Sequence, residues 1–291
     1  MKTNNKSIKI LSFGEIIWDI YPDMRCIGGA PLNFAAHIVN SGAESYLLSA
    51  VGVDELGEKA ISKLKAFGID AEFVSFDDTH PTGQCIVTLD KAGVPSYEIL
   101  SDVAYDNIAL PDVIFENEFH ALSFGTLALR GAKNFLTVQT LIEKGHFDKI
   151  YCDINLRAPF YSEETVKFCL EKANIIKLSE TELEYVVKVI LNDLLDSYDA
   201  AIRKLSEKYP SLDVILITCG ENGSYAYTKK EGRVYHCPAS RVEVVSTVGA
   251  GDSFGASFLV DYLKGRPIDE CLKNSADRSA YVVSHADAVP D

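Results

Sequence analysis

Short apolar runs that are rich in β-branched residues alternate with amphipathic segments along most of the chain. The runs have the length of buried strands and lie at residues 8–14, 46–52, 149–155, 174–179 and 213–220. Between them, apolar side chains recur with the period of an α-helix, as in residues 55–67 and 254–264. Strands that alternate with helices predict right-handed βαβ units and a mostly parallel sheet covered on both faces. We therefore expect a three-layer, Rossmann-like α/β fold.

Residues 83–100 depart from this alternation. They form two strand-like runs around a turn at Lys91, Ala92 and Gly93, with no helical pattern on either side. A hairpin without a crossover helix cannot join a parallel sheet, so we expect it to project from the main sheet. It is either a plain edge hairpin or a lid over the carboxyl ends of the strands, where open α/β sheets bind ligands. No linker-like run interrupts the chain, and residues 1–291 are expected to form one domain.

Composition and charge argue against several classes of function. Hydrophobic residues make up 47% and charged residues 24% of the 291 residues, which are ordinary values for a globular protein. The formal net charge of −14 disfavours binding to nucleic acid or to an anionic membrane. No run of residues is long and apolar enough to be a signal or a bilayer span. Seven cysteines without a CxxC pair or metal-ligand spacing indicate free thiols, and we expect a cytoplasmic protein.

The segment with the most chemical content is residues 241–265, where the pattern predicts a strand, a glycine-rich turn and a helix. Gly249 and Gly251 leave backbone N–H groups uncovered at the start of this helix, which favours an anion. Asp252 falls in the first helical turn. Its carboxylate is either a plain helix cap or a base that faces an anion cradle, an arrangement suited to phosphoryl transfer.

The same turn partly matches two other known motifs. The glycine spacing is one residue away from the dinucleotide fingerprint, and the turn lies near the C-terminus, which argues against a nicotinamide-binding domain. Gly251, Ser253 and Gly255 match the G-x-S-x-G elbow of hydrolases, but too few residues follow for the strands that carry an acid and a histidine. The chain contains no G-x-x-x-x-G-K-[ST] motif either.

A second candidate site lies near the N-terminus. Gly28 and Gly29 lead into a helix with Pro31 in its first turn, and Asn33 lies one turn further. Asp19 and Asn33 together offer the acceptors and donors that neighbouring hydroxyl groups need. The alternative is that both side chains only satisfy local backbone groups.

Together these two segments resemble a known family. GGAPLNFA near the start and TVGAGDSFGASF near the end look like the two signatures of the ribokinase-like (PfkB) carbohydrate kinases. Intermediate blocks follow in the order of that family, including VGVDELGEKAISKLKAFGID, FGTLALRG, DINLR, KLSETEL and LITCGENGS. The resemblance covers essentially the whole chain and is greatest to the fructokinase branch.

The resemblance implies a reaction and the residues that carry it. Asp252 would be the base that takes the proton of a sugar's primary hydroxyl as its oxygen attacks the γ-phosphorus of ATP. The N–H groups of Gly249, Ala250 and Gly251 would form the anion hole. The positions that match the family's sugar contacts are Asp19, Gly29, Asn33 and Arg157. The hairpin, with the strand near residues 16–26, would be the lid, and such lids often form the contact of a homodimer.

The resemblance also implies an ATP site with Mg²⁺. Lys177 and Glu182 lie in the block that organises the metal and the phosphates, although Ser179 stands where the family commonly has asparagine. A charged helix start is the alternative for this block. Thr218, Gly220 and Gly223 match the nucleotide-binding turn.

Two departures leave questions open. Ser246 replaces an aspartate that binds a monovalent cation in the family, and Asp287 stands where a glycine is expected, so either K⁺ activation is lost or Asp287 compensates. Glu98 and Ile99 follow the lid residue Tyr97, and neither favours a sugar acid. A neutral sugar is therefore expected, fructose first. The alternatives are 2-keto-3-deoxygluconate, ribose, or a non-catalytic sugar-binding or regulatory protein.

Overall fold

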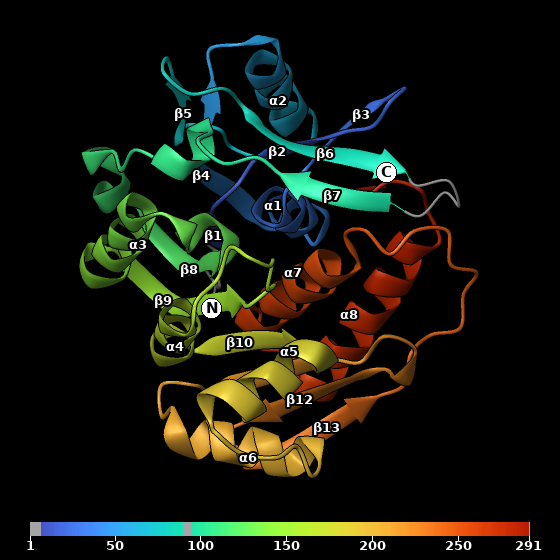
Figure 1. Ribbon diagram of the computed structural model, residues 1–291. Coiled ribbons are helices and arrows are strands. Elements are labelled where there is room, and N and C mark those ends of the chain that lie inside the picture. Colours follow the sequence, from blue (N-terminus) through green and yellow to red (C-terminus); the bar gives the residue numbers. More distant parts are fainter. Residues whose placement is uncertain (1–6, 90–94, 291) are drawn as a thin grey trace, which may run out of the picture.

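The computed structural model describes residues 7–89 and 95–290, and its centre is a nine-stranded sheet (Figure 1). The strand order is β13-β12-β11-β10-β9-β8-β1-β4-β5. The parallel strands are β1 (Lys9–Phe13), β4 (Glu44–Gly52), β5 (Val74–Asp77), β8 (Glu118–Gly125), β9 (His146–Asp153), β10 (Ile175–Ser179) and β11 (Val214–Thr218). At one edge β12 (Ser224–Thr228) and β13 (Arg233–Cys237) run antiparallel. The predicted, mostly parallel α/β sheet is confirmed.

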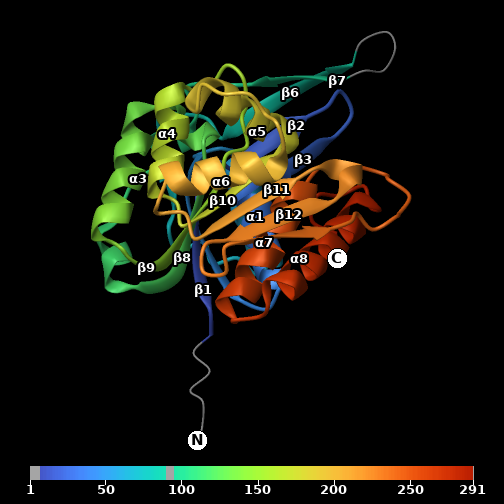
Figure 2. The ribbon, with the colours of Figure 1, turned by 90° about the horizontal axis from the view of Figure 1, so that it is seen from below.

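Helices cover both faces of this sheet, as Figures 1 and 2 show. One face carries α1 (Ala30–Asn40), α2 (Glu55–Ala66), α7 (Ala250–Leu263) and α8 (Ile268–Val283). The other carries α3 (Ala132–Lys144), α4 (Glu163–Lys172), α5 (Glu180–Tyr185) and α6 (Tyr198–Lys208). The alternation of side chains along β1 explains the two layers, because Ile10 packs with Phe34 on one face and Leu11 with Val138 on the other.

Short helical turns complete the main body of the protein. They are η1 (Ala104–Asn107), η2 (Asp112–Glu116), η3 (Leu127–Arg130), the π-helical turn η4 (Val186–Ile190) and η5 (Gly220–Asn222). Over residues 7–89 and 95–290, no helix is long and apolar enough to cross a bilayer. All seven cysteines are free, as predicted. Five of them are buried, whereas Cys26 and Cys237 are half-buried.

A second, four-stranded sheet lies apart from the first and is called the small sheet below. Its order is β3-β2-β6-β7, from β2 (Ile17–Ile20), β3 (Arg25–Gly28), β6 (Gly83–Leu89) and β7 (Pro95–Ile99). The predicted hairpin thus lies outside the main sheet, and its β6 pairs in parallel with β2. The predicted turn at Lys91, Ala92 and Gly93 lies outside the described residues. Figure 1 shows the small sheet above α1.

Side-chain hydrogen bonds hold the small sheet near α2. Asp54 caps α2 by accepting the Gly57 N–H at 2.8 Å. The same carboxylate accepts the Thr82 N–H at 2.8 Å and its hydroxyl at 2.7 Å, immediately before β6. These hydrogen bonds fix the point at which the chain enters the hairpin.

One prediction is wrong: the segment before the glycine-rich turn is not a strand. Residues 238–249 are irregular, and their valines at 242, 244, 245 and 248 are exposed. The segment is held by the N–H groups of Val245 and Ser246, which donate to the Val283 carbonyl at 2.8 and 3.2 Å. β-Branched residues favour a strand only where an edge is free to pair and one face is buried, and here α8 takes these hydrogen bonds instead.

Candidate active site

The predicted site residues gather where the parallel strands end and α7 begins. Asp153 is the last residue of β9, Lys177 pairs with it from β10, and Thr218 is the last residue of β11. Carboxyl ends of parallel strands lie at one edge of a sheet, which is where α/β folds bind ligands. The sheet topology therefore brings together residues that are far apart in the sequence.

The glycine-rich turn needs its glycines for two different reasons. Gly249 caps α7 with a φ of 79°, and a Cβ there would lie 2.5 Å from the Ala288 carbonyl oxygen. A Cβ on Gly251 would lie 3.1 Å from the Lys177 ammonium. The Ala250 N–H donates to the Thr247 carbonyl oxygen at 3.3 Å. Among the described residues, the N–H groups of Gly249 and Gly251 have no hydrogen-bond partner. Two of the three predicted anion-hole donors are thus free.

Asp252 stands in the first turn of α7 and links the two sequence signatures. The Asn33 side chain, on α1, donates its Nδ2 hydrogen to Asp252 Oδ2 at 2.9 Å, across 219 positions of sequence. Burial raises the pKa of Asp252 to about 6, and the nearby Asp153 adds to this effect. The Asn33 hydrogen bond and the charges of Lys177 and Arg157 oppose it. Asp252 is therefore a carboxylate near neutral pH whose proton affinity suits a general base.

Lys177 is a buried cation beside the glycine-rich turn. The residue is 5% exposed, and its Nζ lies 2.7 Å from Asp153 Oδ2. Burial opposes its charge, but Asp153 and Glu182 outweigh this effect and raise the pKa of Lys177. Its ammonium therefore stays charged and adds to the positive potential at the start of α7.

Glu182 is held by backbone groups on both sides. Its Oε2 accepts the Ser179 N–H at 2.7 Å, while the Ser179 hydroxyl accepts the Glu182 N–H, which completes a capping box on α5. Its Oε1 accepts the Leu156 N–H at 2.8 Å. Glu182 therefore holds the loop after β9 against the start of α5.

The donor set around Asp153 fits a hydrated Mg²⁺. Asp153 Oδ1 is buried and has no hydrogen-bond partner among the described residues. Residues 7–89 and 95–290 contain no group of three or more His, Cys, Asp or Glu that could enclose a metal. Mg²⁺ commonly binds through one or two carboxylates, waters and substrate phosphates rather than in an all-protein cage, so Asp153 and Glu182 are compatible with it.

The predicted nucleotide-binding turn follows β11. Thr218 lies opposite Ser179 in the register of β10 and β11. Gly220 has a φ of 52°, and a Cβ there would meet nothing within 4 Å. A Cβ on Gly223 would lie 2.1 Å from the Cys237 carbonyl oxygen. Gly223 thus allows β13 to pack closely, whereas Gly220 borders open space.

The predicted sugar-binding residues lie between α1 and the small sheet. Asp19 on β2 is half-buried. Gly29 has a φ of 106°, and a Cβ there would lie 2.6 Å from the Glu15 carbonyl oxygen. Asn33 is 5% exposed, and its Oδ1 has no partner among the described residues. Arg157 is exposed in the loop after β9, and its charge lowers the pKa of Asp252.

Comparison with known proteins decides the family. Residues 25–290 match the model of the pfkB family carbohydrate kinases. The chain belongs to this family. The protein is therefore a carbohydrate kinase, that is, a phosphotransferase that acts on an alcohol group.

Relatives of this kinase include plant fructokinases. A fructokinase of Solanum tuberosum is 28% identical over 97% of this chain and 91% of the relative. Among solved structures, an uncharacterized sugar kinase of Pyrococcus horikoshii in complex with ATP is 27% identical. It has a TM-score of 0.79 and covers 96% of this chain and 94% of its own. Fructokinase from Vibrio cholerae with fructose, ADP and calcium has a TM-score of 0.81 at 21% identity, with 97% and 95% covered, and shares the fold.

Sequence reasoning missed one buried acid in this kinase. Glu15 is 3% exposed and lies in the short segment between β1 and β2. Burial raises the pKa of Glu15 to about 7, and the Asp252 charge contributes to this rise. The sequence does carry a signal for this acid. Glu15 is a charged residue inside the apolar run of residues 10–18, at the carboxyl end of a strand.

The residues that depart from the family pattern lie close to the site of the kinase. The Ser246 hydroxyl accepts the Val248 N–H at 3.3 Å. The negative charge of Asp287 acts on Cys26 of the small sheet. His37 is fully buried, and burial lowers its pKa to about 4; its Nε2 lies 2.9 Å from the Ala288 carbonyl oxygen. K⁺ activation stays a prediction.

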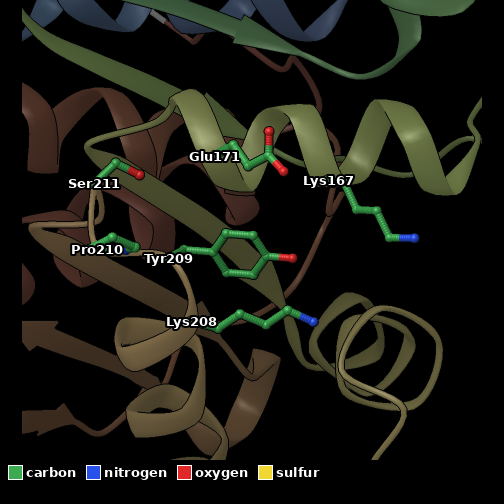
Figure 3. A pocket seen from close by; sticks show the side chains of 6 residues that line it. All are labelled: Lys167, Glu171, Lys208, Tyr209, Pro210 and Ser211. Carbon is green, nitrogen blue, oxygen red and sulfur yellow. The ribbon is translucent and has the colours of Figure 1, made fainter.

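A pocket of about 360 Å³ lies elsewhere in the kinase (Figure 3). It is lined by Lys167, Glu171, Lys208, Tyr209, Pro210 and Ser211. These residues belong to α4 and to the end of α6 with the loop that leads into the start of β11. The pocket therefore lies toward the amino ends of the strands and includes none of the predicted site residues.

Proposed function

We propose that this kinase transfers the γ-phosphoryl group of ATP to the primary hydroxyl of a neutral sugar, fructose first. The observation that carries the proposal is the hydrogen bond from Asn33 to Asp252. It brings the amide of the predicted sugar site and the predicted base to one point at the start of α7. The similarity to fructokinases over nearly the whole chain supports fructose as the first sugar to test.

In this reaction Asp252 removes the proton of the sugar hydroxyl as the hydroxyl oxygen bonds to the γ-phosphorus. The bond from that phosphorus to the β–γ bridging oxygen breaks, and ADP leaves with its electron pair. A pKa of about 6 leaves Asp252 ionised at neutral pH but still able to hold the proton. The N–H groups of Gly249 and Gly251, with Lys177 beside them, offset the charge on the transferring group.

The remaining site residues would bind ATP and its metal. Thr218, Gly220 and Gly223 border the nucleotide, with Gly220 on the open side. Asp153 and Glu182 would hold the water shell of Mg²⁺, which when bound neutralises and orients the phosphates. The P. horikoshii kinase structure contains ATP, and this relative supports the assignment.

The small sheet would act as a lid over the sugar. Asp19 reaches the sugar from β2, Gly29 and Asn33 from the start of α1, and Arg157 from the loop after β9. Closing such a lid excludes water and limits hydrolysis of ATP. Glu98 and Ile99, which follow Tyr97 on β7, favour a neutral sugar over a sugar acid. One domain, residues 1–291, would carry the lid, and two copies would meet through it in a homodimer.

A sugar panel tests the proposal. Fructose, ribose, 2-keto-3-deoxygluconate and other sugars are each incubated with ATP and Mg²⁺, and ADP release is followed in a coupled assay. We expect saturable ADP release with fructose that the Asp252→Asn variant loses. Turnover of another sugar would replace fructose as substrate, and no turnover with any sugar would favour a sugar-binding or regulatory protein. Repeating the assay in Na⁺ and in K⁺ tests cation activation.

A further inference from the structure

A buried histidine joins α1 to the segment that follows α8. His37 is fully buried, and its Nε2 lies 2.9 Å from the Ala288 carbonyl oxygen, across 251 positions of sequence. On the other side of the ring, Nη2 of Arg278 on α8 lies 3.3 Å from Nδ1. Both ring nitrogens therefore contact groups from the C-terminal part of the chain.

These two contacts fix the tautomer of the ring. Burial lowers the pKa of His37 to about 4 and the Arg278 charge adds to this effect, although the Ala288 hydrogen bond opposes it. The imidazole is therefore neutral at neutral pH. A guanidinium has donors but no acceptor, so Nδ1 accepts the hydrogen of Arg278. The single ring proton is then on Nε2, which donates it to the Ala288 carbonyl.

The backbone that His37 holds lies directly against the glycine-rich turn. A Cβ on Gly249 would lie 2.5 Å from the Ala288 carbonyl oxygen and 2.9 Å from the Ala288 Cα. The next residue, Val289, packs against the apolar cluster that α1 and β4 share. The place of Ala288 therefore limits where the Gly249 backbone can lie, and with it the direction of the free Gly249 N–H.

α1 thus contacts the start of α7 at two points one helical turn apart. Asn33 donates to Asp252 at 2.9 Å, and four residues later His37 holds Ala288 beside Gly249. Residues at i and i+4 lie on the same face of a helix. One face of α1 therefore contacts the predicted base directly and a predicted anion-hole donor through Ala288.

We propose that His37 is a positioning residue that orients the Gly249 N–H toward the transferring phosphoryl group. It acts through Ala288 and does not touch the substrate. The inference rests on the proposed function for what the Gly249 N–H binds, whereas the contacts of His37 do not depend on it. Such donors act where charge develops in the transition state, and a displacement of about 1 Å can cost about 100-fold in rate. Loss of His37 should therefore lower kcat and leave sugar binding unchanged.

Steady-state kinetics with fructose and ATP, below the melting temperature of each variant, test the role. We expect His37→Ala to lower kcat by about 10- to 100-fold with KM for fructose unchanged. His37→Gln keeps an N–H donor near the place of Nε2 and should restore most of kcat. Ile38→Ala is the matched control, because Ile38 is the next buried residue of α1 and packs in the apolar core; it should lower stability and leave kcat unchanged. Equal kcat in His37→Ala and Ile38→Ala, or no rescue by glutamine, would overturn the proposal.

A second pair of measurements does not depend on activity. The imidazole ¹⁵N shifts of the wild-type protein should show His37 with its proton on Nε2 and no titration between about pH 5.5 and pH 8. Deuterium exchange should be faster in His37→Ala than in wild type, both in residues 245–252 and in the C-terminal peptide. A proton on Nδ1, a charged ring or unchanged exchange would show that His37 does not hold this segment. A wild-type protein that meets both expectations but turns over no sugar would instead place the failure in the proposed function.

Discussion

Ionisation of the buried Glu15 should cost this protein stability. Glu15 is 3% exposed between β1 and β2, and burial raises its pKa from 4.5 to about 7. A carboxyl whose pKa is raised on folding binds its proton more tightly in the folded than in the unfolded state. Stability from this group is therefore present at low pH and is lost as the pH rises from about 4.5 to about 7.

The change that tests this is Glu15→Gln, which keeps the size of the side chain and removes its charge. A shift of this size corresponds to about 3 kcal/mol when the pH is well above both pKa values. Between about pH 5.5 and pH 8.5 the linkage relation leaves about 2 kcal/mol of this difference. We therefore expect the free energy of unfolding of Glu15→Gln, relative to wild type, to increase by about 2 kcal/mol over that range.

Urea denaturation at the two pH values measures this difference directly, because the terms that both proteins share cancel. Glu143→Gln is the matched control, since Glu143 is exposed on α3, and its relative stability should be the same at both pH values. A constant offset for Glu15→Gln at the two pH values would refute the reasoning. A larger destabilisation at high pH would show that the Glu15 charge is stabilised by its neighbours.

Three further predictions concern the site itself. Asp252→Asn should lower kcat by about 10²- to 10⁴-fold, because a positioned base is lost. Near-normal kcat would refute its role. The wild-type kcat should fall as the pH drops below about 6, where Asp252 binds a proton. Asn33→Ala should move this acidic limb of the pH–kcat profile to higher pH, because it removes the hydrogen bond that lowers the pKa of Asp252. An acidic limb at the same pH in the variant would contradict the Asn33–Asp252 contact. Gly251→Ala places a methyl group 3.1 Å from the Lys177 ammonium and should raise KM for ATP. The control is Gly131→Ala, whose Cβ would meet only the Asp106 carbonyl oxygen at 3.7 Å.

The sequence alone predicts the fold because its signals are local. A period of 3.6 identifies the helix at residues 55–66, and the missing crossover helix separates the hairpin from the main sheet. The strand predicted before the glycine-rich turn was wrong because pairing depends on which sheet edge is free. Valine content cannot report this property.

Sequence motifs predict which residues belong to the site, but not how these residues contact one another. The resemblance identified Asn33 and Asp252 separately, but their hydrogen bond spans 219 positions and follows from the packing of α1 against α7. Glu15 carries no motif, and its relation to the site depends on burial.

The net charge of −14 is compatible with phosphate chemistry because of where the compensating groups lie. Surface charge is screened within about 8 Å at physiological salt, so an acidic exterior acts weakly on a ligand at the carboxyl ends of the strands. Lys177, by contrast, is buried and is held beside Gly251 by Asp153. Backbone N–H groups at the start of α7 add a positive potential that does not depend on net charge. An acidic surface is therefore compatible with the phosphate chemistry proposed for the site.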